Sequence, residues 1–284
     1  MTLDRAGRER RSPFSPFVLF GGARKNAYLI GLLIQRNVES NFRGSLLGLA
    51  WAVLVPLMRL AIYTFVFGVV LGARWPGPPR SSFETALLYF VGLTFFDFFF
   101  DCIGAAPGLI LDYANFVKKV VFPLEILSFV AVGAAIVRFV ITAVILAVLY
   151  LAIHGAPGVA VLSVPLIFLP LILVALGLVW MMALVGTYVR DLRQLIVPLT
   201  LVTMYLSPIF FPVSEVAARA GSTAAKVFYL NPLTLVIEDT RAALFDNRWP
   251  DFGGLALYAF GALIFASVAH GLFIKAKAGF ADVV

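Results

Sequence analysis

Long apolar runs, separated by short polar and basic segments, dominate the hydrophobic pattern of this chain. A helix needs about 20 apolar residues to cross the hydrocarbon core of a bilayer. Six runs reach or approach this length, at residues 46–72, 85–106, 124–153, 160–188, 196–212 and 252–274. The fifth is the least regular, because Pro198, Pro208 and Pro212 interrupt it and proline removes a backbone donor from a helix. The pattern predicts an all-α membrane protein with six transmembrane helices.

Two further segments have a different pattern. Residues 24–43 place Ala27, Ile30, Ile34, Val38 and Phe42 at roughly helical spacing, with charged residues elsewhere around the helix. This predicts an N-terminal amphipathic interface helix, which is either a membrane-surface anchor or a docking surface for a cytoplasmic partner. Residues 205–251 contain apolar pieces that are too short to cross a bilayer, yet too apolar for an ordinary loop. We expect short re-entrant helices there, before the last span.

The composition supports the membrane assignment and sets the orientation. Hydrophobic residues make up 62% of the 284 residues and charged residues only 13%, against about half and a quarter in soluble domains. Most of the 22 lysines and arginines fall before residue 45, at 118–119, at 190–193 and at 275–277. Basic residues accumulate in cytoplasmic segments, so we expect both termini in the cytoplasm and the chain in the inner membrane. The predicted parts are a cytoplasmic N-terminus with the interface helix (1–45), a six-span domain (46–275) with external region 205–251, and a cytoplasmic tail (276–284).

Most enzyme and metal-binding motifs are missing from the sequence. There is no GxxxxGK[ST], no HExxH and no GxSxG, and no cleavage-site pattern follows the basic RERR at 8–11. His154 and His270 are far apart, and Cys102 is the single cysteine, so we expect no metal site and no disulfide. The net charge of +7 is not gathered in one patch, so we expect no nucleic acid partner. We expect a transport protein without catalytic residues, bound cofactor or nucleotide site of its own.

Charged residues occur inside three of the predicted spans. Arg59, Asp97 and Arg138 lie about midway along the first, second and third spans, and Asp101 lies one turn from Asp97. Ionised groups are costly in a bilayer, so we expect the carboxylates to meet the arginines across a helix interface or in a water-filled cavity. Structural ion pairs, a polar substrate path and a proton relay remain open. For a path, the candidates are Arg59, Phe95, Phe96, Asp97, Phe98, Phe100, Asp101 and Arg138.

Several motifs occur in order along the chain. The first is in residues 36–72, at Arg43, Gly44, Ser45, Leu47, Gly48, Trp51, Pro56, Tyr63, Phe67 and Gly68. The second is GLTFFDFF at 92–99, and the series continues with NFVKKVVFPLEIL (115–127), VRDLRQLIVPL (189–199), SPIFFP (207–212) and NPLTLVIEDTR (231–241). Together these motifs resemble the ABC-2-type permeases that export polysaccharides. The second motif departs from that family, since Thr94 and Phe95 stand where the family has Pro-Trp.

The resemblance implies a homodimer of six-span subunits with a channel along its axis. It also implies a separate ABC ATPase subunit on the cytoplasmic face, where ATP and Mg would bind. The segment at 24–43 would then meet the ATPase rather than serve as a bare anchor. The residues implied for ATPase coupling are Arg36, Arg43, Asn115, Lys118, Lys119, Arg190 and Asp191. The residues implied for an external gate are Tyr205, Pro208, Phe210, Phe211, Asn231 and Pro232.

The expected function is the channel-forming subunit of an ABC exporter for lipid-linked polysaccharide, of O-antigen type first and capsular type second. Teichoic acid export is a less favoured variant of the same function, and periplasmic or outer-membrane export proteins are further candidate partners. An ABC-2 exporter permease for a small hydrophobic drug or lipid is the main alternative. A more distant one is an ion-coupled carrier that uses Asp97 and Asp101.

Overall fold

The computed structural model describes residues 12–40, 47–70, 75–76, 81–114 and 122–282. Every regular element in these residues is a helix, as the sequence predicts. Four of the seven predicted ATPase-coupling positions lie outside the described residues, namely Arg43, Asn115, Lys118 and Lys119.

Four helical stretches are long and apolar enough to cross a membrane. The first consists of α4 (Ser82–Ala105), the 3-10 turn η3 (Ala106–Gly108) and α5 (Leu109–Asp112), and the second is α7 (Ile126–His154). The third joins η4 (Val159–Ser163) to α8 (Val164–Tyr188), and the fourth joins α12 (Phe252–Ala276) to η5 (Lys277–Asp282). These candidate spans coincide with those predicted at 85–106, 124–153, 160–188 and 252–274.

The other two predicted spans are present as shorter apolar helices, so the count of six is not confirmed. The first contains η1 (Gly48–Ala50), α3 (Trp51–Tyr63) and a stretch of π-helix, η2 (Thr64–Val70). The fifth contains α9 (Leu192–Tyr205), whose 14 residues extend over roughly 21 Å at 1.5 Å per residue. This is short of a hydrocarbon core about 30 Å thick. Pro208 and Pro212 follow the end of α9, and proline cannot continue the hydrogen-bond pattern of a helix.

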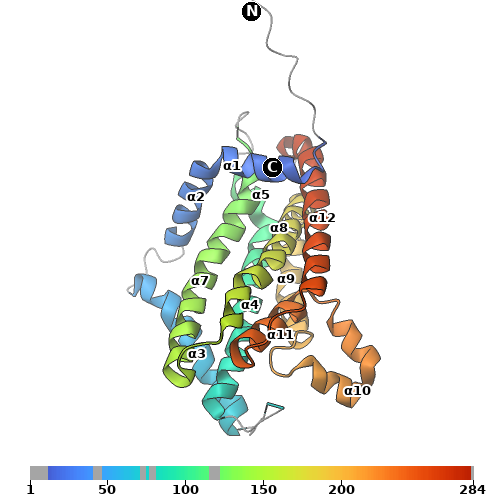
Figure 1. Cartoon of the computed structure of the whole chain (residues 1–284). Coiled ribbons are helices and arrows are strands. Elements are labelled where there is room, and N and C mark those ends of the chain that lie inside the picture. Colours follow the sequence, from blue (N-terminus) through green and yellow to red (C-terminus); the bar gives the residue numbers. More distant parts are fainter. Residues whose placement is uncertain (1–11, 41–46, 71–74, 77–80, 115–121, 283–284) are drawn as a thin grey trace, which may run out of the picture.

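The interface helix predicted at 24–43 falls mainly on the second helix of a bent pair. α1 (Pro16–Lys25) and α2 (Ala27–Ser40) meet at 72°, and taken as one bent span they are together long and apolar enough to be a fifth. Leu33 of α2 is buried against Ile126 and Val130 of α7, with Ile30 and Ile34 packed beside it. α1 lies across the end of the bundle where the C-terminus also lies (Figure 1).

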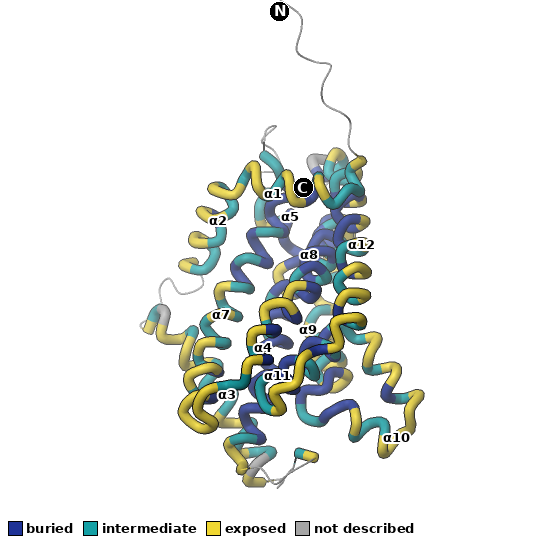
Figure 2. Tube along the Cα trace, in the orientation of Figure 1, coloured by how far each residue is buried: buried dark blue, intermediate teal, exposed yellow. Residues whose placement is uncertain are grey.

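The core of the bundle is centred on α4 and α8. α8 packs most extensively on α12, and α4 on α7, and buried residues are concentrated along the centre of the bundle (Figure 2). Nearly all of α4 between Thr85 and Ile103 is buried, whereas α3 and α9 have no buried residue. Two of the predicted spans therefore lie at the periphery of a single chain, with apolar side chains exposed.

The region between α9 and α12, where the sequence predicts short re-entrant helices, contains two helices, and their re-entry into the membrane stays a prediction. α10 (Val213–Phe228) and α11 (Pro232–Phe245) lie at the end of the bundle opposite α1 (Figure 1). We call this the distal end, and the end that carries α1 and the C-terminus the terminal end. α4 begins at the distal end with a capping box, in which Ser81 and Glu84 bind each other's backbone N–H groups.

Candidate functional site

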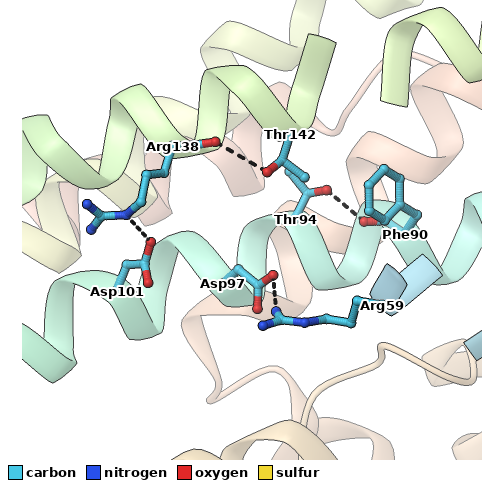
Figure 3. Close-up of polar contacts among 7 residues, drawn as sticks. All are labelled: Arg59, Phe90, Thr94, Asp97, Asp101, Arg138 and Thr142. Carbon is cyan, nitrogen blue, oxygen red and sulfur yellow. Dashed lines mark hydrogen bonds and ion pairs between the residues drawn. The ribbon is translucent and has the colours of Figure 1, made fainter. Parts of the chain in front are cut away.

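The two carboxylates of α4 bind arginines from two neighbouring helices. The guanidinium of Arg59, on α3, donates to the carboxylate of Asp97, and Arg138 Nε, on α7, donates to Asp101 Oδ2 at 2.6 Å (Figure 3). The expected pairing across helix interfaces is thus present. Each ion pair places opposite formal charges in contact, so the formal charges of the four groups cancel, which lowers the cost of their burial.

A cavity of about 240 Å³ lies among α3, α4 and α7. All four charged residues line it, together with Trp51, Val55, Thr94, Phe98, Phe139 and Thr142. The hydroxyls of Thr94 and Thr142 donate to carbonyls of their own helices, at 2.7 and 3.2 Å (Figure 3). Arg138 Nη1 is buried and has no hydrogen-bond partner among the described residues. The chain thus holds a polar cavity about halfway along a span.

The phenylalanines of α4 are mostly committed to packing within the chain. Phe95 and Phe98 contact Phe139 of α7 and Phe168 of α8, with ring centroids 4.7–5.8 Å apart. Phe96 packs on Phe100 at 4.6 Å. Phe98 also lines the polar cavity, and Phe100 lines a separate apolar groove beside α9. Their assignment to a substrate path stays a prediction.

An aromatic cluster lies distal to the polar cavity. Phe210 stacks on Phe67 of η2 at 4.6 Å and lies 5.3 Å from Tyr63, which is one turn from Arg59 on the same helical segment. Tyr89 of α4 completes the cluster, 5.4 Å from Phe67 and 5.8 Å from Phe210. The cluster thereby joins the segment after α9 to the outer parts of α3 and α4.

The structure brings several of the predicted gate residues together at residues 206–212. Asn231 caps α11 through its side-chain oxygen and donates from Nδ2 to Leu206 O and Ser207 Oγ. Pro232 O accepts from Tyr258 Oη at 3.0 Å, and Phe211 packs on Phe228. Tyr205, at the end of α9, is 65% exposed.

Arg241 is the functional candidate that the sequence did not reveal. Its guanidinium, 5% exposed, donates to the carbonyls of Leu88, Pro208 and Ile209. The sequence signal was weak, since Arg241 follows two acidic residues, Glu238 and Asp239, at the end of the segment NPLTLVIEDTR. Its partners are backbone carbonyls, which have no counterpart in a residue pattern.

The predicted coupling residues that the structure describes lie towards the terminal end and are exposed. Arg36 lies on α2, and Arg190 and Asp191 form the turn between α8 and α9. Close to this turn, Arg193 pairs with Asp112 at 2.6 Å and so ties the start of α9 to the end of the α4 span. Within the described ranges, no group of three or more His, Cys, Asp or Glu side chains could hold a metal ion.

Long apolar helices around a polar, ion-paired cavity define a multi-pass membrane protein. The model of the ABC-2 type transporter family matches residues 28–245, and the chain belongs to this family. It is similar to an O-antigen export system permease protein RfbA of Myxococcus xanthus, 26% identical over 250 residues that cover 88% of this chain and 93% of that protein. A protein of the same name from Klebsiella pneumoniae is 23% identical over 262 residues, covering 90% of this chain and 96% of the relative.

Proposed function

We propose that this chain is the membrane subunit of an ABC exporter that moves a lipid-linked polysaccharide, of O-antigen or capsular type, across the cytoplasmic membrane. The observation that carries the proposal is its similarity, over nearly the full length, to relatives named as O-antigen export permeases. A separate ATPase subunit supplies the energy and binds ATP and Mg. This chain supplies the passage.

A polysaccharide requires such a passage because of its hydroxyl groups. Each polar group that enters hydrocarbon without a partner costs roughly several kcal/mol. The cavity at Asp97, Asp101, Arg59 and Arg138 offers charged and hydroxyl groups at mid-span, and the cluster around Phe210 offers aromatic surface. Both features support a polar, aromatic route along α4.

The working unit is a homodimer with both termini in the cytoplasm. α3 and α9 contain no buried residue, although both are apolar and proline-containing. Burial of these two helices against a second copy would cover the apolar surface that a single chain exposes and would place the polar cavity beside the dimer axis. The terminal end then faces the ATPase, with Arg36, Arg190 and Asp191 available for contact. The segment 205–251 forms the external region, where periplasmic or outer-membrane export proteins would bind.

Reconstitution tests the proposal directly. The full chain is purified with the ATPase that copurifies with it and placed in proteoliposomes with a radiolabelled lipid-linked polysaccharide. ATP added outside the vesicles reaches only complexes whose ATPase faces outward, and these move their cargo towards the lumen. We therefore expect the polysaccharide to become protected from an external glycosidase only when ATP is added, and a hydrolysis-deficient ATPase variant serves as the control. Transport that follows a proton gradient without ATP would instead identify an ion-coupled carrier.

A further inference from the structure

The chain breaks its helical hydrogen-bond pattern directly after α9. α9 ends at Tyr205, Pro208 and Pro212 have no N–H to donate, and α10 begins at Val213. We call residues 206–209 the break. Carbonyl groups there have no helical partners, and they need donors from elsewhere in the protein. Leu206 O accepts from Asn231 Nδ2 at 3.1 Å, while Pro208 O and Ile209 O accept from Arg241. Both donors belong to α11 or its cap.

Arg241 connects three parts of the chain with one guanidinium. Its Nη1 and Nη2 bind the break, at Pro208 O and at Ile209 O (2.6 Å), and its Nε donates to Leu88 O of α4 at 2.9 Å. The guanidinium also lies 4.6 Å from the ring centroid of Trp75, and Glu238 Oε1 lies 3.6 Å from Nη1. Three separate nitrogens of the planar guanidinium each bind one carbonyl, and the single ammonium nitrogen of a lysine does not reproduce this arrangement.

α4 leaves space for this contact by means of a glycine. A Cβ atom at Gly92 would lie 2.8 Å from Arg241 Nη2 and 3.1 Å from Ile209 Cα. Both distances are below ordinary van der Waals contact. Gly92 precedes Asp97 by five residues, which is roughly 7.5 Å along the helix. The break is therefore held against α4 just distal to the polar cavity.

We propose that Asn231 and Arg241 form a two-point latch, which holds residues 206–209 against α4 and keeps the distal end of the passage shut. The latch rests on the proposed function, because it presumes that a passage runs along α4. In this arrangement α11 and the break move together, since both latch side chains extend from α11 or its cap to the break. Opening requires the guanidinium to leave the carbonyl of Leu88. Arg241 and Asn231 are thus positioning residues, which act through the backbone of the break.

The substitution Asn231→Asp distinguishes the role of Asn231 in the latch from its role as the N-cap of α11. Aspartate keeps the side-chain oxygen that accepts from Leu233 N, and it is as good an N-cap as asparagine. It lacks the Nδ2 group that donates to Leu206 O and Ser207 Oγ. Arg241→Lys removes the second point while it keeps the positive charge. Arg219→Gln is the matched control, because Arg219 is also at the distal end but pairs, among the described residues, with Glu215 of its own helix.

The readout is leakage of carboxyfluorescein from proteoliposomes that contain the full chain and its ATPase, without ATP. We expect Asn231→Asp and Arg241→Lys to leak several-fold faster than wild type, and Arg219→Gln to match wild type, with elution volume and melting temperature unchanged. Equal leakage for all variants overturns the latch, as does leakage found only together with loss of native elution. If Arg241→Lys fails to fold, the leakage rate of Asn231→Asp alone tests the latch. Failure of the proposed function is a distinct result, namely a wild-type complex that does not export polysaccharide with ATP.

Discussion

Asp97 and Asp101 lie one turn apart on α4, yet they bind arginines from two different helices, Arg59 of α3 and Arg138 of α7. α4 therefore acts as a shared acidic strip between two basic neighbours. Because α3 is otherwise peripheral and has no buried residue, the contact between Arg59 and Asp97 is a main polar connection of that helix to the bundle. The same groups line the cavity, so structural and passage roles overlap there.

Removal of one charge at the pair between Asp101 and Arg138 should destabilise the protein. Asp101→Asn leaves Arg138, whose Nη1 already has no partner among the described residues, without its carboxylate. Hydrogen bonds to charged groups contribute roughly 1.5–3 kcal/mol, so we expect a loss of that order. The measurement is the temperature of half-unfolding in detergent, compared with wild type.

The double variant Asp101→Asn with Arg138→Gln is the matched control. It removes both charges, so no ion is left uncompensated in the bundle, and we expect most of the stability to return. Single-variant stability equal to that of wild type, with export abolished, would contradict the structural role. That result would assign Asp101 to the passage itself.

Exchange of the other pair tests whether Arg59 and Asp97 interact with each other rather than with the solvent. Asp97→Arg alone places three arginines beside Asp101, and we expect poor membrane insertion and a low yield of dispersed protein. The exchanged variant, Arg59→Asp with Asp97→Arg, restores a pair of opposite charges between α3 and α4. It should therefore recover a large part of the yield. The yields are measured by fluorescence size-exclusion chromatography of tagged protein. Equal yields of the single and exchanged variants would show that the two side chains are energetically independent.

The sequence predicted some of these relationships well, and the physical reason is clear in each case. Apolar length alone located α4, α7, α8 and α12, because hydrocarbon thickness sets the length of a span. Equal depth in neighbouring spans predicted that Asp97 and Asp101 would meet arginines. Depth could not say which arginine each would bind, since that depends on helix rotation.

Other relationships could not be predicted from residue patterns. Arg241 binds carbonyls of Leu88, Pro208 and Ile209, and a backbone carbonyl is the same at every position. α1 and the bend at Asn26 were also missed, because the predicted interface helix began at residue 24 and so included only the last two residues of α1. The phenylalanines of α4 gave an ambiguous signal, since packing within the bundle and lining of a path both require aromatic residues.

A methyl group at Gly92 should disturb the distal end of the protein. Gly92→Ala brings Cβ within 2.8 Å of Arg241 Nη2 and 3.1 Å of Ile209 Cα, and the guanidinium is fixed by three carbonyls. Overpacking of this kind costs roughly 1–3 kcal/mol. Gly104→Ala is the control on the same helix, because a Cβ there meets nothing within 4 Å. Thermal unfolding of both variants checks the prediction, and equal destabilisation would contradict a specific contact at Gly92.

A charge reversal at Arg190 tests which end of the bundle meets the ATPase. Arg190 is exposed in the turn between α8 and α9, so Arg190→Glu should leave folding and membrane insertion unchanged. If this turn contacts the ATPase, a reversed charge there disfavours binding, since like charges brought together at an interface cost several kcal/mol. A loss of roughly 1.4 kcal/mol already weakens the complex about tenfold.

Arg219→Glu supplies the matched reversal at the distal end, where Arg219 is 80% exposed on its side chain. We expect Arg190→Glu to lower both copurification of the ATPase and polysaccharide-dependent ATP hydrolysis, and Arg219→Glu to leave both at the wild-type level. Loss of the ATPase from the Arg219→Glu variant alone would place the cytoplasm at the distal end and reverse the proposed orientation. Retention of the ATPase by both variants would mean that the α8–α9 turn makes no energetically important contact with it.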